Sequence, residues 1–325
     1  MTRTTPTSAH TTVLLSEAVE MLEIVPGDTV VDATLGGAGH FAKLLGALGA
    51  DGVLVGIDAD PDAVSRARDV VAHDTRAKRP TVHIIEDNFK NLGHIVERVG
   101  ALPLNRALFD LGWSGYHLTS GRGFSFQSDE PLYMTYGRPE SAERTAADIV
   151  NSMPEDELAD LIYTLGDETF SRQIAKSIAL HRRKERILTT NQLVAAIVAG
   201  VPASKQHGRI NPATKTFQAL RIAVNDELSA AQSGITAALS LLAPGGRVAV
   251  ITFHSIEDRL VKSLFRDAAE QGAGTLVTKK PVAPSDMELA ENPRARSAKL
   301  RVFEKAAAPY RAASSLSVLS HDHAF

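Results

Sequence analysis

The chain has no cysteine and no long apolar run, and each absence excludes a class of structure. Without thiols there are no disulfides, no thiolate metal sites and no cysteine nucleophile. The opening residues, MTRTTPTSAH, contain no apolar signal segment, and no stretch approaches the ~18 apolar residues of a membrane span. We therefore expect a cytoplasmic protein with no membrane partner. Its 325 residues are long for a single core and predict one large α/β domain plus a second unit.

The net charge of −3 conceals an uneven distribution of charged residues. Residues 128–168 contain eleven acids and two arginines, whereas residues 172–221 contain ten lysines or arginines and one acid, Glu185. This asymmetry predicts one basic face of the kind that a polyanion such as a nucleic acid needs. The alternative is a set of solvated helix faces.

Glycines interrupt a β-branched run in residues 29–40, TVVDATLGGAGH, and a second apolar run, VLVGID, ends on Asp58. This pattern predicts a buried parallel strand, a tight turn that a ligand can approach closely, a helix and a second strand. Asp58 follows Gly36 by 22 positions, close to the ~20 expected for a carboxylate that holds ribose hydroxyls.

The turn lacks two signatures of phosphate-bearing cofactors. The third glycine of the dinucleotide fingerprint is missing after Gly39, and no Gly-Lys-Ser/Thr P-loop follows. Asp32 inside the first strand would repel a pyrophosphate but suits an amino group. S-adenosyl-L-methionine has an amine, a ribose and no phosphate, so these residues favour it, although the glycines alone leave other nucleotide ligands open.

Strands and helices alternate along much of the chain. Strands are expected near 29–33, 53–58, 81–86, 106–110, 247–253 and 298–305, with helices near 12–22 and 39–48 and after Pro61. This alternation predicts an α/β fold with a parallel sheet covered on both faces. A single long helix is expected from Asn211, as its N-cap, to Leu242.

Residues 115–210 interrupt the alternation because they contain helical patterns only, near 155–165, 171–181 and 190–199. The insertion follows the fourth strand at its carboxyl end, where open α/β sheets bind ligands. The predicted organisation is a cofactor-binding domain of residues 1–114 and 211–325 with an inserted all-helical, substrate-binding domain of residues 115–210.

Asp110 and Trp113, in the sequence DLGW, follow the fourth strand and lie over the expected cofactor site. Methyl transfer to an exocyclic amine requires the nitrogen lone pair, delocalised into the base, to be aimed at the methyl group. A carboxylate that accepts hydrogen bonds from the N–H groups can orient the nitrogen in this way, and a nearby aromatic ring can stack on the base. Asp110 and Trp113 are therefore the candidate catalytic residues, with the alternative that one caps a turn and the other only packs.

The histidines offer weaker signals. Ser255 is expected to cap a helix with Asp258 completing a capping box, and His254 either belongs to this structural element or contacts substrate. His10, His117 and His207 share no ligand spacing, so no metal site is expected. The pair His321 and His323 lies in a tail predicted to be frayed.

Six blocks of the sequence resemble the bacterial small-subunit ribosomal RNA cytosine-N4 methyltransferases, the family called RsmH or MraW. The blocks are 10–15 (HTTVLL), 32–40 (DATLGGAGH), 122–126 (RGFSF), 211–221 (NPATKTFQALR), 253–259 (FHSIEDR) and 292–297 (NPRARS). The resemblance implies a class I, Rossmann-like methyltransferase sheet with an inserted domain that receives the cytidine. It also implies S-adenosyl-L-methionine as donor, and cofactor contacts at Gly37, Ala38, Gly39, His40, Asp58, Phe89, Asp110 and His117.

The expected function is N4-methylation of a cytosine, cytosine 1402 by this resemblance, in the decoding region of 16S rRNA in the small ribosomal subunit. Two alternatives remain: an amino-group methyltransferase acting on another nucleic acid, and a catalytically inactive RNA binder in ribosome assembly. The oligomeric state is open and a homodimer is compatible with the sequence.

The chain departs from the family pattern at several positions. His117 replaces a glutamine, Gly115 a serine and Asn211 a histidine, and residues 133–136 read Tyr-Met-Thr-Tyr where an acid and an arginine are usual. Tyr133 and Tyr136 are interpreted as stacking residues that replace the lost charges.

Overall fold

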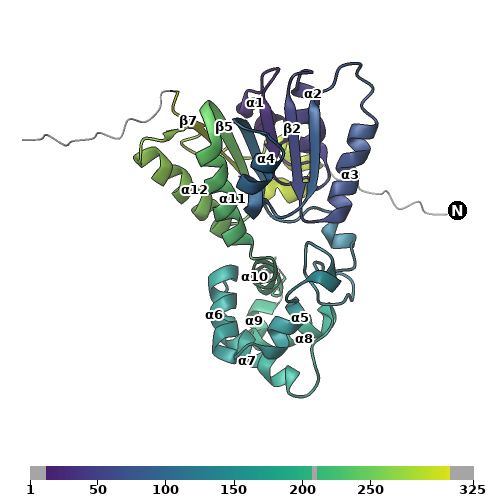
Figure 1. Cartoon of the computed structure of the whole chain (residues 1–325). Helices are drawn as coiled ribbons and strands as arrows, with labels where there is room; N and C mark the ends of the chain where they lie inside the picture. Colours follow the sequence, from purple (N-terminus) through teal and green to yellow (C-terminus); the bar gives the residue numbers. More distant parts are fainter. Residues whose placement is uncertain (1–11, 207–210, 308–325) are drawn as a thin grey trace, which may run out of the picture.

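A computed structural model of the chain describes residues 12–206 and 211–307 and shows a layered α/β part above a separate cluster of helices (Figure 1). His10, His207, His321 and His323 lie outside the described residues. No helix in the described ranges is long and apolar enough to cross a membrane.

Seven strands form one sheet in the order β3-β2-β1-β4-β5-β7-β6. The five strands from β3 to β5 are parallel, whereas β7 runs antiparallel to both β5 and β6. The prediction of a largely parallel α/β sheet is confirmed, but β6 was missed because three residues are too few to show a period. The strands are β1 (Thr29–Asp32), β2 (Val53–Asp58), β3 (Thr81–Glu86), β4 (Leu104–Asp110), β5 (Leu242–Thr252), β6 (Gly274–Leu276) and β7 (Lys299–Lys305).

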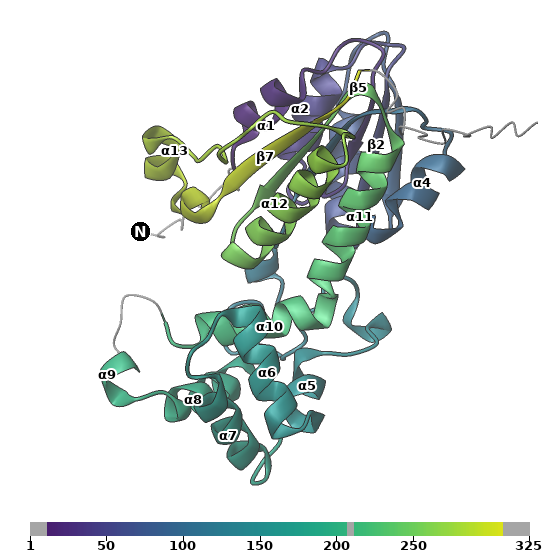
Figure 2. The same ribbon diagram turned by 90° about the vertical axis from the view of Figure 1, so that its left-hand side faces the viewer.

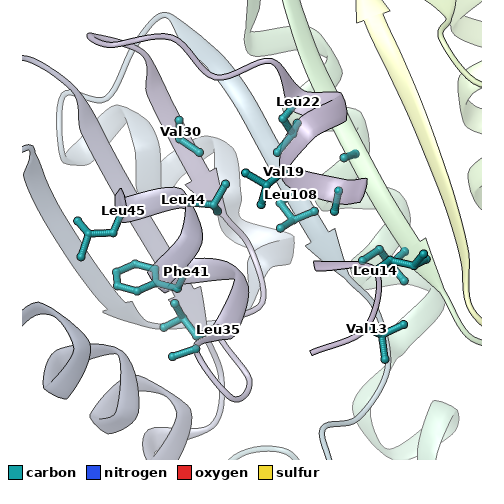
Figure 3. Packing of buried hydrophobic residues seen from close by; sticks show 14 of the residues in the cluster. Val13, Leu14, Val19, Leu22, Val30, Leu35, Phe41, Leu44, Leu45 and Leu108 are labelled. Carbon is teal, nitrogen blue, oxygen red and sulfur yellow. The ribbon is translucent and has the colours of Figure 1, made fainter. Parts of the chain in front are cut away.

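Both faces of the sheet are covered because successive strand residues point to opposite sides. Val30 and Leu108 belong to the core under one set of helices, and their neighbours Val31 and Phe109 belong to the core on the other side. Figure 3 shows the first core, where Phe41 and Leu44 of one helix face Val30. The first face is covered by α1 (Leu15–Leu22), α2 (Gly39–Ala47) and α3 (Pro61–Ala72), and the second by α4 (Leu92–Arg98), α11 (Glu227–Leu241) and α12 (Ser255–Glu270).

The inserted helices have a hydrophobic core of their own, which includes Ile149, Ile162, Ile178 and Leu193. Two of them begin with capping boxes, at Thr145 and Thr189, which explains where the chain turns into helix. The helices are α5 (Ala146–Ser152), α6 (Glu155–Gly166), α7 (Ser171–Arg182), α8 (Thr190–Gly200) and α9 (Ala203–Gln206).

The expected single helix from Asn211 to Leu242 is wrong, because the chain breaks at Asp226 into α10 (Thr214–Asn225) and α11. Asp226 has φ 48°, a left-handed conformation that ends a helix. The apolar stripe continues through the break but serves two cores: Phe217 packs among the inserted helices, and Ile235 packs on the sheet. Asn211 is not the cap; its side chain accepts a hydrogen bond from the Ala213 amide at 2.8 Å.

Figure 2 shows α10 lying on the helical cluster and α11 rising along the sheet. We therefore propose that the inserted unit extends to Asn225 instead of ending at residue 210.

Gly234 of α11 provides a test of this packing. A Cβ there would lie 2.8 Å from the Phe89 carbonyl oxygen, whereas a Cβ at Gly46 of α2 would meet nothing within 4 Å. We expect Gly234→Ala to lower the free energy of unfolding by about 1–2 kcal/mol, because overpacking exceeds the gain in helix propensity. Gly46→Ala, the matched control, should raise it by about 0.5–1 kcal/mol. Urea unfolding measures the free energy of unfolding of both variants. Equal changes in the two variants would contradict the close approach of α11 to Phe89.

Candidate active site

Three acids meet where β1, β2 and β4 end at the carboxyl edge of the sheet. Asp58 accepts hydrogen bonds from the Gly36 amide at 2.9 Å and the Asp60 amide at 2.8 Å. Burial raises the pKa of Asp58 to about 6. Burial also raises the pKa of Asp32 well above its usual range, and the charges of Asp110 and Asp58 add to that effect. The edge is therefore an electronegative site that suits a cationic or hydroxyl-rich ligand.

The glycine turn between β1 and α2 has the geometry that the sequence predicted. Gly36 has φ 46° and Ala38, which precedes α2, has φ 63°. A Cβ at Gly39 would collide with the Thr12 side chain, so only glycine lets the amino-terminal segment pack on the turn. His40, in the first turn of α2, is buried.

These residues fit S-adenosyl-L-methionine. Asp32 is fully buried, and its Oδ2 atom has no hydrogen-bond partner among the described residues. The ammonium group of the methionine moiety would supply both a donor and the opposite charge that this carboxylate lacks. Asp58 at the end of β2 would accept ribose hydroxyls. Phe89 follows β3 and meets Phe109 edge-on at 5.8 Å, which gives the site an apolar wall.

Asp110 lies on the opposite side of this turn from Asp58. Its backbone amide donates to Thr34 Oγ1 at 2.7 Å, and its Oδ2 atom is 3.6 Å from His40 Nδ1. Its Oδ1 atom is buried and has no hydrogen-bond partner among the described residues. Burial, followed by the negative charge of Glu257, raises the pKa of Asp110 to about 7. Asp110 thus presents an unused acceptor beside the cofactor turn.

A cavity of about 140 Å³ opens next to Trp113, between the sheet and the inserted helices. A cavity of ~150 Å³ is known to hold one benzene ring, so this space matches a single six-membered ring. Its lining is mainly aromatic, with one cation at its wall. The lining residues are Trp113, Phe124, Phe126, Met134, Thr214, Phe217, Gln218 and Arg221. The sequence singled out Trp113 as a candidate site residue, whereas Phe126 and Phe217 lie in blocks of the family resemblance to which no role was assigned.

His117 is buried and held between aromatic rings, with Phe124 at 5.1 Å and Tyr136 at 5.0 Å. The Ser114 amide donates to Nδ1 at 3.0 Å, so the proton is on Nε2, 3.6 Å from Asp60 Oδ2. Burial, then Arg122, lowers the pKa of His117 to about 3, and the ring is neutral. His117 therefore lies beside Asp60, two residues beyond Asp58.

Tyr136 is not available as a stacking platform. Its ring already lies on Phe124 at 5.6 Å with an interplanar angle of 9°, and its hydroxyl donates to Glu227 at 3.0 Å. Tyr136 is therefore a stacking residue, as the sequence suggested, but its stacking partner is Phe124. Tyr133, by contrast, is exposed.

The prediction that Ser255 is the N-cap of α12 is wrong. His254, not Ser255, is the N-cap, and its Nδ1 atom accepts from the Glu257 amide at 3.3 Å. Asp258 takes no part in a capping box because it pairs with Arg301 at 2.7 Å and Lys299 at 3.0 Å. Glu257 is the residue that sequence reasoning missed: it lies 3.8 Å from where a Cβ of Gly112 would be, beside the DLGW turn.

Glu227, His254 and Glu257 have ligand atoms within 4.8 Å of one another, a spacing compatible with a metal ion. Arg221 nevertheless holds both oxygens of Glu227, at 2.7 and 2.8 Å, and His254 Nε2 lies 3.1 Å from Glu257. A cation placed there would face a guanidinium and would have to displace these contacts. The chemistry favours a hydrogen-bonded cluster, and the absence of a metal stays a prediction.

Comparison with known proteins identifies the family. The family model described as the MraW methylase family matches residues 7–306. The chain belongs to the MraW methylase family. It is 46% identical over 305 residues to ribosomal RNA small subunit methyltransferase H of Deinococcus radiodurans, with 94% of this chain and 92% of that protein covered. The protein of the same name from Brevibacillus brevis is 42% identical, with 93% and 99% covered.

Solved structures are similar to this methylase only at low sequence identity and low TM-score. An rRNA methylase from Streptococcus thermophilus is 14% identical with a TM-score of 0.42, covering 89% of this chain and 94% of that one. A SAM-dependent O-methyltransferase from Thermotoga maritima is 10% identical with a TM-score of 0.41, covering 91% and 66%. The methylase is an enzyme whose methyl donor is S-adenosyl-L-methionine.

The basic stretch of this methylase is partly used within the protein. Arg172 pairs with Asp160, Arg182 donates to the Val150 carbonyl, and Lys215 donates to the Asp167 carbonyl. Arg221 is buried, so it is not one of the cations that could meet phosphates. Among the described residues of this stretch, the exposed cations besides Arg172 are Lys176, Arg183, Lys184, Arg186 and Lys205.

The raised pKa of Asp110 predicts a pH dependence. Only the ionised carboxylate is a full acceptor, so kcat/KM should rise with pH through a midpoint near the pKa of about 7. Glu257→Gln removes the like charge, and the midpoint should move to lower pH. Methyl-transfer rates between pH 5.5 and 8.5 measure this. An unchanged midpoint in the variant would show that Glu257 does not act on Asp110.

Asp58 is expected to dominate cofactor affinity. Asp58→Ala should weaken binding of S-adenosylhomocysteine by about 10- to 100-fold, because hydrogen bonds to a charged group are lost. Titration calorimetry measures the Kd. Asp51→Ala, an exposed acid in the turn before β2, is the control and should leave it unchanged. Equal affinities in all three proteins would remove Asp58 from the site.

Proposed function

We propose that this methylase transfers a methyl group from S-adenosyl-L-methionine to the N4 atom of a cytosine in the decoding region of 16S rRNA, cytosine 1402 by family resemblance. The observation that carries the proposal is the buried, unpartnered Oδ1 atom of Asp110, together with a cavity sized for one pyrimidine ring that is lined by Trp113, three residues further along the chain. The name of the relatives, ribosomal RNA small subunit methyltransferase H, supports an RNA substrate in the small ribosomal subunit.

Asp110 would orient the reacting amine. Its free carboxylate oxygen would accept a hydrogen bond from an N–H group of the amine. This hydrogen bond would draw the nitrogen lone pair out of conjugation with the ring and aim it at the methyl carbon. The cofactor, when bound, supplies this methyl as part of a sulfonium. A nitrogen–carbon bond would replace the carbon–sulfur bond of that sulfonium, and Asp110 or water would take the surplus proton of the product amine.

Trp113 would flank the base. Its side chain lines the cavity yet is 38% exposed, so one part is available to a ring that enters from outside. A cytosine paired in a helix cannot reach Asp110, so the target must be extruded or already unstacked. His117, Phe89 and the turn from Gly37 to His40 would complete the cofactor site.

The exposed lysines and arginines of α7, α9 and the α7–α8 loop would contact RNA phosphates. Lys176, Arg183, Lys184, Arg186 and Lys205 are the cations concerned. A cytoplasmic location follows from the proposed ribosomal substrate and is part of the same proposal. A homodimer remains compatible with this arrangement.

Two alternative functions are separated by one experiment. Purified small ribosomal subunits lacking the modification, naked 16S rRNA and naked DNA are each incubated with the enzyme and tritiated cofactor. We expect transfer to the subunits, with N4-methylcytidine in the nucleoside digest. Preference for naked DNA would indicate another amino-group methyltransferase, and subunit binding without transfer would indicate an inactive assembly factor.

Variants at the two proposed catalytic positions should behave differently. Asp110→Ala should lower kcat at least about 100-fold, because the acceptor acts in the transition state. Trp113→Ala should mainly raise KM, by about 5- to 100-fold, through lost stacking on the base. Steady-state methylation of subunits measures both. Full activity in Asp110→Ala would contradict the proposed mechanism.

A further inference from the structure

We infer that Arg221 reads the acceptor edge of the target pyrimidine and is the residue that selects cytosine. The inference rests on the proposed function and extends it to a second contact with the same base. Arg221 lies on α10 and lines the cavity beside Trp113, yet only 7% of it is exposed. A buried cation at the wall of a ring-sized cavity requires an explanation beyond packing.

Glu227 determines which part of the guanidinium is available. Its two carboxylate oxygens accept from Arg221 Nε at 2.7 Å and Nη2 at 2.8 Å, a bidentate pair. Tyr136 donates its hydroxyl to the same carboxylate at 3.0 Å. No hydrogen bond among the described residues uses Arg221 Nη1. The guanidinium is therefore held in one orientation by two of its nitrogens, with the third free to donate.

The backbone around this pair is also anchored. Asn225, one turn after Arg221, donates to the Arg221 carbonyl at 2.9 Å and to the Met134 carbonyl at 2.7 Å, and its Oδ1 accepts from the Tyr136 amide at 2.8 Å. These contacts tie α10 to the segment that carries Tyr136, beside the break at Asp226. The position of Arg221 is thus determined by three segments of the chain.

The chemistry matches cytosine and rejects uracil. Next to its exocyclic amine, cytosine carries two acceptors, ring N3 and O2. Asp110 accepts from the amine, and Arg221 Nη1 would donate to N3 or O2 of the same ring. Uracil presents a carbonyl to the carboxylate and an N–H in place of the N3 acceptor, so both contacts become repulsive when Arg221 donates to N3, whereas O2 is common to the two bases. A purine is excluded by size, because the cavity of about 140 Å³ holds one ring.

The other charged groups near Arg221 do not replace this role. Glu257 and Tyr136 act on it electrostatically, but Glu257 accepts from the Phe253 amide at 2.8 Å and lies beside His254. Phosphate binding is an unsuitable role, because the bound carboxylate and the burial of the side chain both oppose a second anion. A neutral acceptor such as a pyrimidine carbonyl is the ligand chemistry that remains.

The test crosses enzyme variants with substrate analogues. Small subunits are assembled with 16S rRNA that carries cytidine, 3-deazacytidine or 2-thiocytidine at the target position, so that one acceptor is removed or weakened. Wild-type enzyme should lose about 5- to 150-fold in kcat/KM on the analogue whose acceptor Arg221 contacts, the range of one good base contact. The Arg221→Met variant should lose a similar factor in kcat/KM on cytidine. Its kcat/KM on that analogue should be no lower than its kcat/KM on cytidine.

Two controls separate this outcome from misfolding and from failure of the proposed function. Arg266→Met, an exposed arginine on α12, should leave all rates unchanged. The Kd of S-adenosylhomocysteine should be the same in Arg221→Met and wild type. If the wild-type enzyme accepts both analogues as well as cytidine, or if Arg221→Met loses equally on every substrate, the inference is wrong. If wild type methylates no cytidine in the subunit, the proposed function itself fails.

Discussion

The burial of several carboxylates at one edge of the sheet is the constraint on which the site depends. Asp32, Asp58 and Asp110 end three adjacent parallel strands, and Glu257 approaches from α12, so like charges share a small desolvated volume. Such an arrangement costs folding free energy unless a partner neutralises it. A cofactor that bears an ammonium and a sulfonium is the partner that this edge fits, so the strain in the unliganded protein favours binding.

The second constraint is that two separate hydrophobic cores must hold one site between them. The sheet supplies the cofactor turn and Asp110, whereas the helical unit supplies most of the cavity wall. The break at Asp226 makes this possible, because a continuous helix could not pack α10 and α11 against cores that lie in different directions. Arg221 and Glu227 stand on either side of the break, and their pairing joins the two units where the base would enter.

The departures from the family pattern acquire a physical meaning in this arrangement. His117, where a glutamine is usual, is neutral and enclosed by Phe124 and Tyr136, so it adds no charge beside Asp60. Tyr136, the last residue of the segment in which an acid and an arginine are usual, donates to Glu227 and helps to orient Arg221. These residues therefore belong to the support of the site. Trp113, Tyr116 and Tyr133 are exposed aromatic residues in the same part of the chain.

The sequence by itself determined the elements whose signals are local. β-branched runs and glycines located β1, β2 and the turn between them, and they placed Asp58 at the end of the second strand, where it accepts from the Gly36 amide at 2.9 Å. Motif blocks identified the family. Only the tertiary structure decided what depends on residues distant in the chain: the break at Asp226, the cap at His254, and the approach of Glu257 to Asp110. The burial of Arg221 beside Glu227 belongs to the same group, because a charged residue on an amphipathic helix predicts exposure until its buried partner is known.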